Sequence, residues 1–468
     1  MSSDDVTTEK LAEFNGNSRI ADSAASIHSV SEQIALENGH PIRYRSCSWQ
    51  KITALLMSEY ICLAILSFPW SFSVLGMAPA VIVTVSVAFS VLYTSYILWK
   101  FCMKHPEVRD VCDIGRIVFG GSELAYKLTG LMFILNNIFI QAFHCIVGAK
   151  LLNTLTNSSL CTMTSSAITA VACFVVGLPR TLNQLGGLGT ISAISMAIAV
   201  LLGVIFSGLQ SHPAGFTGEA PIVTILPVSG TTYVLGMSAF LNITCTLLGQ
   251  IMMPSFIAEM KNPRDFPKAL WAVTMSTIVV YTLCGAIMYH FIGNQYIVAP
   301  AFGSLQPVYK KIAFSFAIPT IVYLGSLYSS ITARFVFFRL YRKSHHLYTN
   351  TLQGWFAWSG INALTWVLAF VLAEIIPFFS DMLSLISALF AQHNTRFILW
   401  GMAYFMLYQT SERWGGARRN AETLLNYFLI LLGYYILIAG TYASIQSIRD
   451  SYKAAQVGSI FSCASNAI

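Results

Sequence analysis

The chain has 468 residues, of which 55% are hydrophobic and only 10% are charged. A soluble domain usually carries about 25% charged residues, so the composition excludes an ordinary soluble enzyme and predicts an all-α polytopic membrane protein in a lipid bilayer. The net charge of +7 does not indicate a nucleic-acid partner, because the basic residues lie in short segments between apolar stretches.

Residues 1–47 are polar and lack an apolar period, so we expect a disordered cytosolic N-terminal tail. A membrane-spanning helix needs about 20 apolar residues. The rest of the chain is predicted to form a transmembrane domain over 48–447 and a short outer tail over 448–468. Eleven spans are predicted: 52–75, 78–101, 127–155, 162–178, 187–209, 231–259, 267–292, 310–336, 353–375, 378–407 and 423–446.

The basic residues orient these spans. With the N-terminus in the cytosol, inner segments carry 18 Lys and Arg residues and outer segments carry 5, as the positive-inside rule requires. The sequon Asn157-Ser158-Ser159 then lies in an outer loop, where Asn157 is a candidate glycosylation site. Cys161 and Cys463 are the two cysteines expected outside the spans, and the sequence leaves open whether they pair.

Two spans contain helix-breaking residues at mid-membrane depth. The first break is predicted in Leu63–Trp70 (LAILSFPW), and the second begins at Gly249 and Gln250 and includes Pro254. Glycine loosens a helix, and proline removes a backbone donor. Broken backbone is tolerated in a bilayer only where it is buried in protein or lines a wet cavity. Two such spans indicate the substrate site of a secondary transporter.

The breaks come first in two halves of five spans each, 1–5 and 6–10, with span 11 extra. An odd number of spans per half gives the halves opposite orientations. The broken helices present free amides at one end and free carbonyls at the other, which suit the carboxylate and ammonium of an amino acid. No charged side chain lies in Leu63–Trp70 or Thr246–Pro254, which favours a substrate with a neutral side chain.

These residues resemble a known family. The chain is similar over about 48–447 to the amino acid/auxin permease family, and most closely to its fungal neutral amino acid permease branch. The matching segments are SEYICLAILSFPWSFSVLG (58–76), CDIGRIVFGG (112–121), GLPRTL (177–182), GQIMMPSFIAEMKNPRDFPKAL (249–270), APAFGS (299–304) and AEIIPFFSDMLSLISALF (373–390). The resemblance implies a leucine-transporter-like 5+5 inverted repeat with spans 1 and 6 broken, and symport of amino acids.

The chain departs from the family pattern in two places. Cys62, Ala64 and Ser67 stand where the family often has glycines before the span 1 proline, and the polar run 392–396 interrupts span 10. The resemblance implies that the substrate contacts the breaks through residues of both spans. These are Ala64, Ile65, Leu66 and Ser67 in span 1 and Thr246, Leu247, Leu248, Gly249 and Gln250 in span 6.

Polar residues of span 3 are further candidates. Asn137, Gln141 and His144 share one helix face and would line the pocket; the alternative is a stripe of interhelical hydrogen bonds. Ionisable residues inside a membrane are functional candidates by default. His144 is matched by a histidine in the fungal branch and is the candidate for proton coupling, the alternative being a neutral imidazole bonded to a backbone carbonyl.

The remaining coupling or gating candidates lie in other spans. Glu59 would gate span 1 or carry the proton, and Glu259 would form a salt-bridged gate. The serines of span 8 would either coordinate sodium or pack helices together. These candidates are Glu59, Glu259, Ser326, Ser329, Ser330 and His393. No metal site or cofactor is predicted.

The sequence predicts a transporter that imports neutral, aliphatic or aromatic, amino acids by proton symport, with sodium as the alternative ion. The plasma membrane is favoured over the vacuolar membrane. A nutrient sensor with the same fold would carry the same binding site. An acyltransferase is the remaining alternative, because His105 and Asp110 have the spacing that such enzymes use for general-base chemistry.

Overall fold

The structure is a computed structural model that describes residues 47–461 and 463, except 109, 181, 248, 342–343, 345, 347–350, 391–396, 409 and 455–460. Across the described residues the chain is helical. The strand-like pairing found there is an isolated parallel bridge between Cys47 and Met260. The predicted tail 1–47 lies outside the described residues apart from Cys47.

The helices follow the predicted order of spans. The first half contains α3 (Trp49–Tyr60), η1 (Leu63–Ser67), α4 (Phe68–Leu75), α5 (Met77–Lys104), α6 (Val111–Val118), α7 (Glu123–Leu155), α8 (Thr162–Val176) and α9 (Leu182–Leu209). The second half contains α10 (Tyr233–Cys245), η2 (Gly249–Ile251), α11 (Met253–Glu259), η3 (Pro263–Asp265), α12 (Phe266–Ile292), η4 (Ala301–Ser304), α13 (Pro307–Leu340), α14 (Leu352–Ile375), α15 (Phe379–Ile386) and α16 (Ile398–Leu407). The chain continues through α17 (Thr410–Arg413), α18 (Ala417–Tyr435), η7 (Ile436–Gly440) and α19 (Thr441–Lys453).

These helices account for the eleven predicted spans. Seven helical stretches of the described chain are each long and apolar enough to cross a membrane, and α3 with η1–α4 forms an eighth, bent by 41°. The other three predicted spans correspond to the shorter apolar helices α8, α10 and the pair α15 and α16. The last span is longer than predicted, because η7 joins α18 to α19 and the helix ends at Lys453 rather than near 446.

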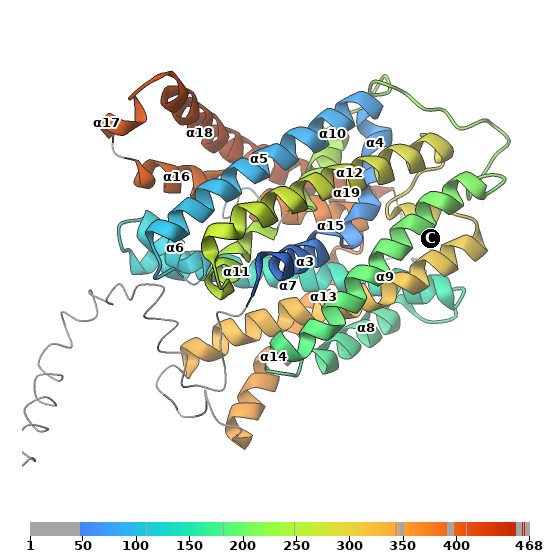
Figure 1. The fold of residues 1–468 in the computed structure, drawn as a ribbon. Helices are drawn as coiled ribbons and strands as arrows, with labels where there is room; N and C mark the ends of the chain where they lie inside the picture. Colours follow the sequence, from blue (N-terminus) through green and yellow to red (C-terminus); the bar gives the residue numbers. More distant parts are fainter. Residues whose placement is uncertain are drawn as a thin grey trace, which may run out of the picture.

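The broken helices lie in the middle of the bundle (Figure 1). Helix α12 packs on α3, α4 and α5, while α13 packs on α7, α8, α9 and α14. Helix α10 contacts η1, and α3 contacts η2, so each break lies against the other broken helix. Helix α18 lies at the edge of the bundle, next to α16 and α17 (Figure 1).

Two links outside the helices hold the ends of this bundle. Cys161, just before α8, forms a disulfide with Cys463, which settles the pairing that the sequence left open. At the other end of the bundle, the Cys47 amide donates to the Glu259 carbonyl at 3.0 Å, and the Lys261 amide donates to the Cys47 carbonyl at 2.9 Å. The second link joins the beginning of the first span to the end of the sixth.

Candidate functional site

The break in the first span lies earlier than its sequence suggested. Helix α3 ends at Tyr60, and Cys62 is fully extended, with φ −118° and ψ 179°. The candidate substrate residues Ala64, Ile65, Leu66 and Ser67 then form the buried 3₁₀ turn η1. Pro69 lies in the first turn of α4, where a missing backbone donor costs nothing, so proline restarts the helix rather than breaking it.

The break in the sixth span has the same construction. Helix α10 ends at Cys245, Thr246 and Leu247 form a turn, and Gly249 and Gln250 lie in η2. Pro254 is again in the first turn of the following helix, α11. The predicted substrate residue Leu248 lies outside the described residues.

A glycine and a tyrosine bring the two breaks together. A Cβ atom added at Gly249 would approach Cε2 of the Tyr60 ring to 2.7 Å, so the absence of a side chain lets the sixth span pack on the first. Tyr281 of α12 joins both breaks from the side. Its hydroxyl donates to the Tyr60 carbonyl and lies 3.5 Å from the Thr246 carbonyl. Nothing in the sequence distinguished Tyr281 from the other tyrosines of the spans.

The described conformation is closed at this point. A cavity of about 10 Å³ lies beside Tyr60 and Leu247, between α5 and α12. A cavity of this size holds about one water molecule.

Gln250 is directed away from the other break. Its Nε2 lies 2.9 Å from the Val91 carbonyl, 2.8 Å from Thr94 Oγ1 and 2.6 Å from Ser95 Oγ, all on α5, and its two hydrogens can serve two of these acceptors. Gln250 is fully buried, and its Oε1 has no hydrogen-bond partner. In this conformation the side chain anchors the second break to α5.

The polar face of α7 divides into bonded and unbonded residues. Asn137 donates to Thr332 Oγ1 of α13 at 3.0 Å and accepts from Asn136 Nδ2 at 3.2 Å. Gln141, one helical turn further on, is fully buried, and neither Oε1 nor Nε2 of its amide has a partner. An unpartnered buried amide is costly, because it has lost its water and gained nothing in exchange. Of the two amides on this face, Asn137 is bonded and Gln141 is without a partner.

Two buried ionisable groups have one hydrogen bond each. His144 Nδ1 lies 2.8 Å from the Ile140 carbonyl, so Nδ1 carries the hydrogen, and Nε2 has no partner. The alternative to proton coupling given above requires this bond to a backbone carbonyl, which a protonated imidazole can make as well. Glu59 Oε1 accepts from the Tyr328 hydroxyl at 3.0 Å, and its Oε2 is buried without a partner.

The three serines of span 8 donate to backbone carbonyls. Ser326 donates to Cys173 at 2.8 Å and Ser330 to Gly177 at 2.9 Å, which joins α13 to the end of α8. Ser329 donates to the Ser326 carbonyl at 3.0 Å. The bonds agree with the helix-packing alternative. No cluster of three or more His, Cys, Asp or Glu side chains suited to a metal ion occurs in the described part of the chain.

The other candidates lie away from the breaks. Glu259 ends α11, and the charges that act on its carboxylate are those of Arg334 and Lys51; its gating role stays a prediction. Asn157 lies in the loop before α8, and its Oδ1 accepts from Lys311 Nζ at 2.8 Å. His393 lies outside the described residues.

The acyltransferase alternative requires His105 and Asp110 to act together. His105 Nδ1 instead lies 3.0 Å from Glu107 Oε1. Asp110 caps the N-terminus of α6, accepting from two backbone amides of that helix, and lies 3.5 Å from Arg339. Both side chains have local structural partners, which disfavours this alternative.

Comparison with solved structures identifies the fold. The chain is similar to an inward-facing structure of Mhp1, with a TM-score of 0.52 at 14% identity over 88% of this chain and 93% of that one. It is also similar to a substrate-bound, outward-open Na⁺-coupled sialic acid symporter, with a TM-score of 0.50 at 12% identity over 90% and 93%. The expected leucine-transporter-like fold, with spans 1 and 6 broken, is confirmed.

Sequence comparison identifies the family. The N amino acid transport system protein of Neurospora crassa is 31% identical over 92% of this chain and 90% of its own length. The auxin transporter-like protein 1 of Arabidopsis thaliana is 24% identical over 91% and 87%. The family model described as transmembrane amino acid transporter protein matches residues 45–446. The chain therefore belongs to the transmembrane amino acid transporter protein family, as its sequence motifs predicted.

Proposed function

We propose that this amino acid transporter imports amino acids with neutral, aliphatic or aromatic side chains by proton symport. The observation that carries the proposal is the junction of two uncharged helix breaks, where Tyr60 packs on Gly249. Separation of the breaks would expose peptide groups to the substrate's carboxylate and ammonium. It would place no charged residue of Leu63–Trp70 or Thr246–Pro254 beside the substrate's side chain.

The amide of Gln141 supports this assignment of a substrate site on α7. It is a buried donor and acceptor without a partner. A polar group that approaches it during opening would therefore gain a hydrogen bond without displacing an existing one. Asn137, by contrast, already bonds to Thr332 and would have to exchange that partner. We therefore assign Gln141 the more direct substrate contact of the two.

Proton coupling rests on Glu59 and His144. Each has one buried polar atom without a partner, so each can take up or release a proton without breaking a salt bridge. Glu59 stands on the last turn of α3, directly before the first break, where movement of the span changes its surroundings. The bonds that Ser326 and Ser330 make to carbonyls favour protons over sodium as the coupling ion.

The proposed orientation places the N-terminus in the cytosol and the protein in the plasma membrane. The excess of basic residues at one end of the spans supports it. The disulfide between Cys161 and Cys463 lies at the other end, and disulfides persist in oxidising surroundings such as the cell exterior.

Uptake by the purified protein in liposomes tests the whole proposal. Imposed proton and sodium gradients would be compared with a panel of neutral, acidic and basic amino acids. We expect concentrative uptake of neutral amino acids under an inward proton gradient alone. Uptake that requires sodium would refute the coupling ion, and preference for a charged amino acid would refute the substrate class. Substrate binding without uptake under either gradient would identify a sensor instead.

A further inference from the structure

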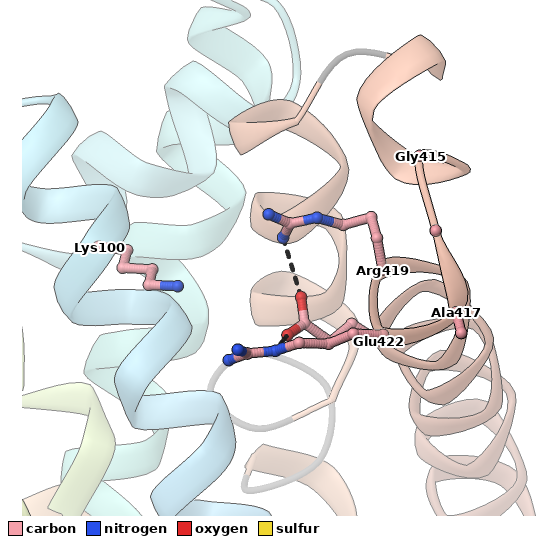
Figure 2. A pocket seen from close by; sticks show the side chains of 7 residues that line it. Lys100, Gly415, Ala417, Arg419 and Glu422 are labelled. Atoms are coloured by element: carbon pink, nitrogen blue, oxygen red, sulfur yellow. Dashed lines mark hydrogen bonds and ion pairs between the residues drawn. The ribbon is translucent and has the colours of Figure 1, made fainter.

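A second cavity lies far from the helix breaks, between α5 and α18. It has a volume of about 430 Å³, and its lining comprises Lys100, Gly415, Gly416, Ala417, Arg418, Arg419 and Glu422. Figure 2 shows Lys100 extending from α5 toward the Arg419 and Glu422 side chains of α18. The transport mechanism proposed above uses none of these residues.

The charges around this cavity are unbalanced. Glu422 is the single carboxylate of the lining, and it pairs with Arg418 at 3.2 Å and with Arg419 at 2.8 Å. Lys100 Nζ bonds to the Tyr408 hydroxyl at 3.3 Å, which brings no negative charge. Three cations therefore share one anion, and the cavity keeps a surplus of two positive charges.

One aromatic residue holds the two sides of the cavity together. The Arg419 guanidinium lies 3.9 Å from the centre of the Tyr408 ring, whose hydroxyl bonds to Lys100. Tyr408 thus contacts cations of both α5 and α18, while the carboxylate of Glu422 pairs with the two arginines only. A guanidinium has five N–H donors, so Arg419 can pair with Glu422 and still donate to a phosphate.

The position of the cavity indicates where such a phosphate comes from. Arg418 and Arg419 lie within the first turn of α18, immediately before its apolar stretch, and Lys100 faces them from α5. That helix lies at the edge of the bundle, and the side chains of Leu424, Phe428 and Leu431 are 60%, 59% and 69% exposed. Trp414, beside the cavity, is half exposed, as expected for an aromatic residue at the membrane interface. A lipid whose headgroup filled the cavity would have an apolar helix face for its chains.

We propose that this cavity binds the phosphate-bearing headgroup of an anionic phospholipid, with the acyl chains along α18. Basic pockets between membrane helices on the cytoplasmic side are suited to phosphoinositide and similar headgroups. The bound lipid would hold α18 against α5. In the orientation proposed above, the lipid belongs to the cytosolic leaflet.

Lipid binding can be measured without transport. Purified protein would be titrated with phosphatidylinositol 4,5-bisphosphate in phosphatidylcholine nanodiscs, and bound lipid counted by native mass spectrometry. Each cation near a membrane surface is worth about 1 kcal/mol, or about fivefold in affinity. We expect Lys100→Gln to weaken binding about fivefold, because this change leaves both pairs of Glu422 intact. Arg116→Gln is the matched control, since Arg116 is an exposed basic residue of α6 paired with Glu123 at 3.1 Å.

The outcomes separate the proposal from its rivals. Equal weakening by Lys100→Gln and Arg116→Gln would indicate general surface attraction and overturn the site. Binding of inorganic phosphate or soluble inositol trisphosphate as tightly as the lipid would overturn the lipid as its source. Weakening by Lys100→Gln alone, with the soluble headgroup at least about tenfold weaker than the lipid, would support the proposal. Failure of amino acid uptake would leave this result unchanged.

Discussion

The hydroxyl of Tyr281 offers a direct test of how the two breaks are held closed. It donates to the Tyr60 carbonyl from α12, while the Tyr281 ring packs on Phe68 with centroids 4.9 Å apart. Tyr281→Phe removes the hydroxyl and keeps the ring. We expect the closed conformation to lose stability relative to any conformation in which the breaks separate.

The hydrogen bonds around the Tyr60 carbonyl determine how much stability the closed conformation loses. The Tyr60 carbonyl also accepts from the Cys62 amide at 2.8 Å, so it keeps one donor after the substitution. The contact of Tyr281 with the Thr246 carbonyl, at 3.5 Å, is too long to add much. The cost is then that of one ordinary hydrogen bond, about 1 kcal/mol. The population of open conformations should rise about fivefold.

Labelling of Cys245 measures this population. This residue is only 5% exposed and lies at the end of α10, directly before the second break. We expect Tyr281→Phe to increase its rate of reaction with N-ethylmaleimide about fivefold, measured by peptide mass spectrometry. Tyr289→Phe is the matched control. It removes a hydroxyl from the same helix, but one that bonds to Asn294 and to the Thr224 amide of the segment between α9 and α10.

An unchanged Cys245 rate in Tyr281→Phe would refute the role of the hydroxyl. An equal increase in Tyr289→Phe would show general loosening of α12 instead.

Three further substitutions test the proposed transport site. Gly249→Leu should lower uptake about 5- to 150-fold at normal surface expression, because overpacking against Tyr60 costs about 1–3 kcal/mol. Uptake at the native rate would show that Gly249 is not part of the site. His144→Ala should weaken the pH dependence of uptake more than it weakens substrate binding, and equal loss of both would contradict proton coupling through this residue. Glu59→Gln should abolish uptake driven by a proton gradient, while exchange of internal for external substrate continues. Accumulation of substrate in this variant under a proton gradient would exclude Glu59 as the proton carrier.

The sequence predicted the helix breaks because their cause is local. Glycine and proline change the local backbone, and Gly249, Pro69 and Pro254 lie within or directly after the two breaks, whereas Pro319 lies inside the unbroken helix α13. The exact place of the first break was less predictable. It lies at Cys62, where no residue type signals an extended conformation.

Side-chain directions required the structure, because they depend on which helices are neighbours. Gln250 lies in the predicted break, yet it bonds to α5. Gln141 and Asn137 share a helix face, yet Asn137 is bonded and Gln141 is not. Tyr281 was missed altogether, since its importance comes from the carbonyls that meet it from two distant parts of the chain.

The bridge between Cys47 and the end of α11 constrains how this transporter can open toward the N-terminal side. The two main-chain bonds attach the segment before α3 to residues 259 and 261, so the beginning of the first broken span is joined to the end of the other. Substrate release on that side must either break both bonds or swing the two ends outward as one piece. A truncated chain that begins at Cys47 would keep both of these main-chain bonds, whereas a chain that begins at Ser48 would lose them.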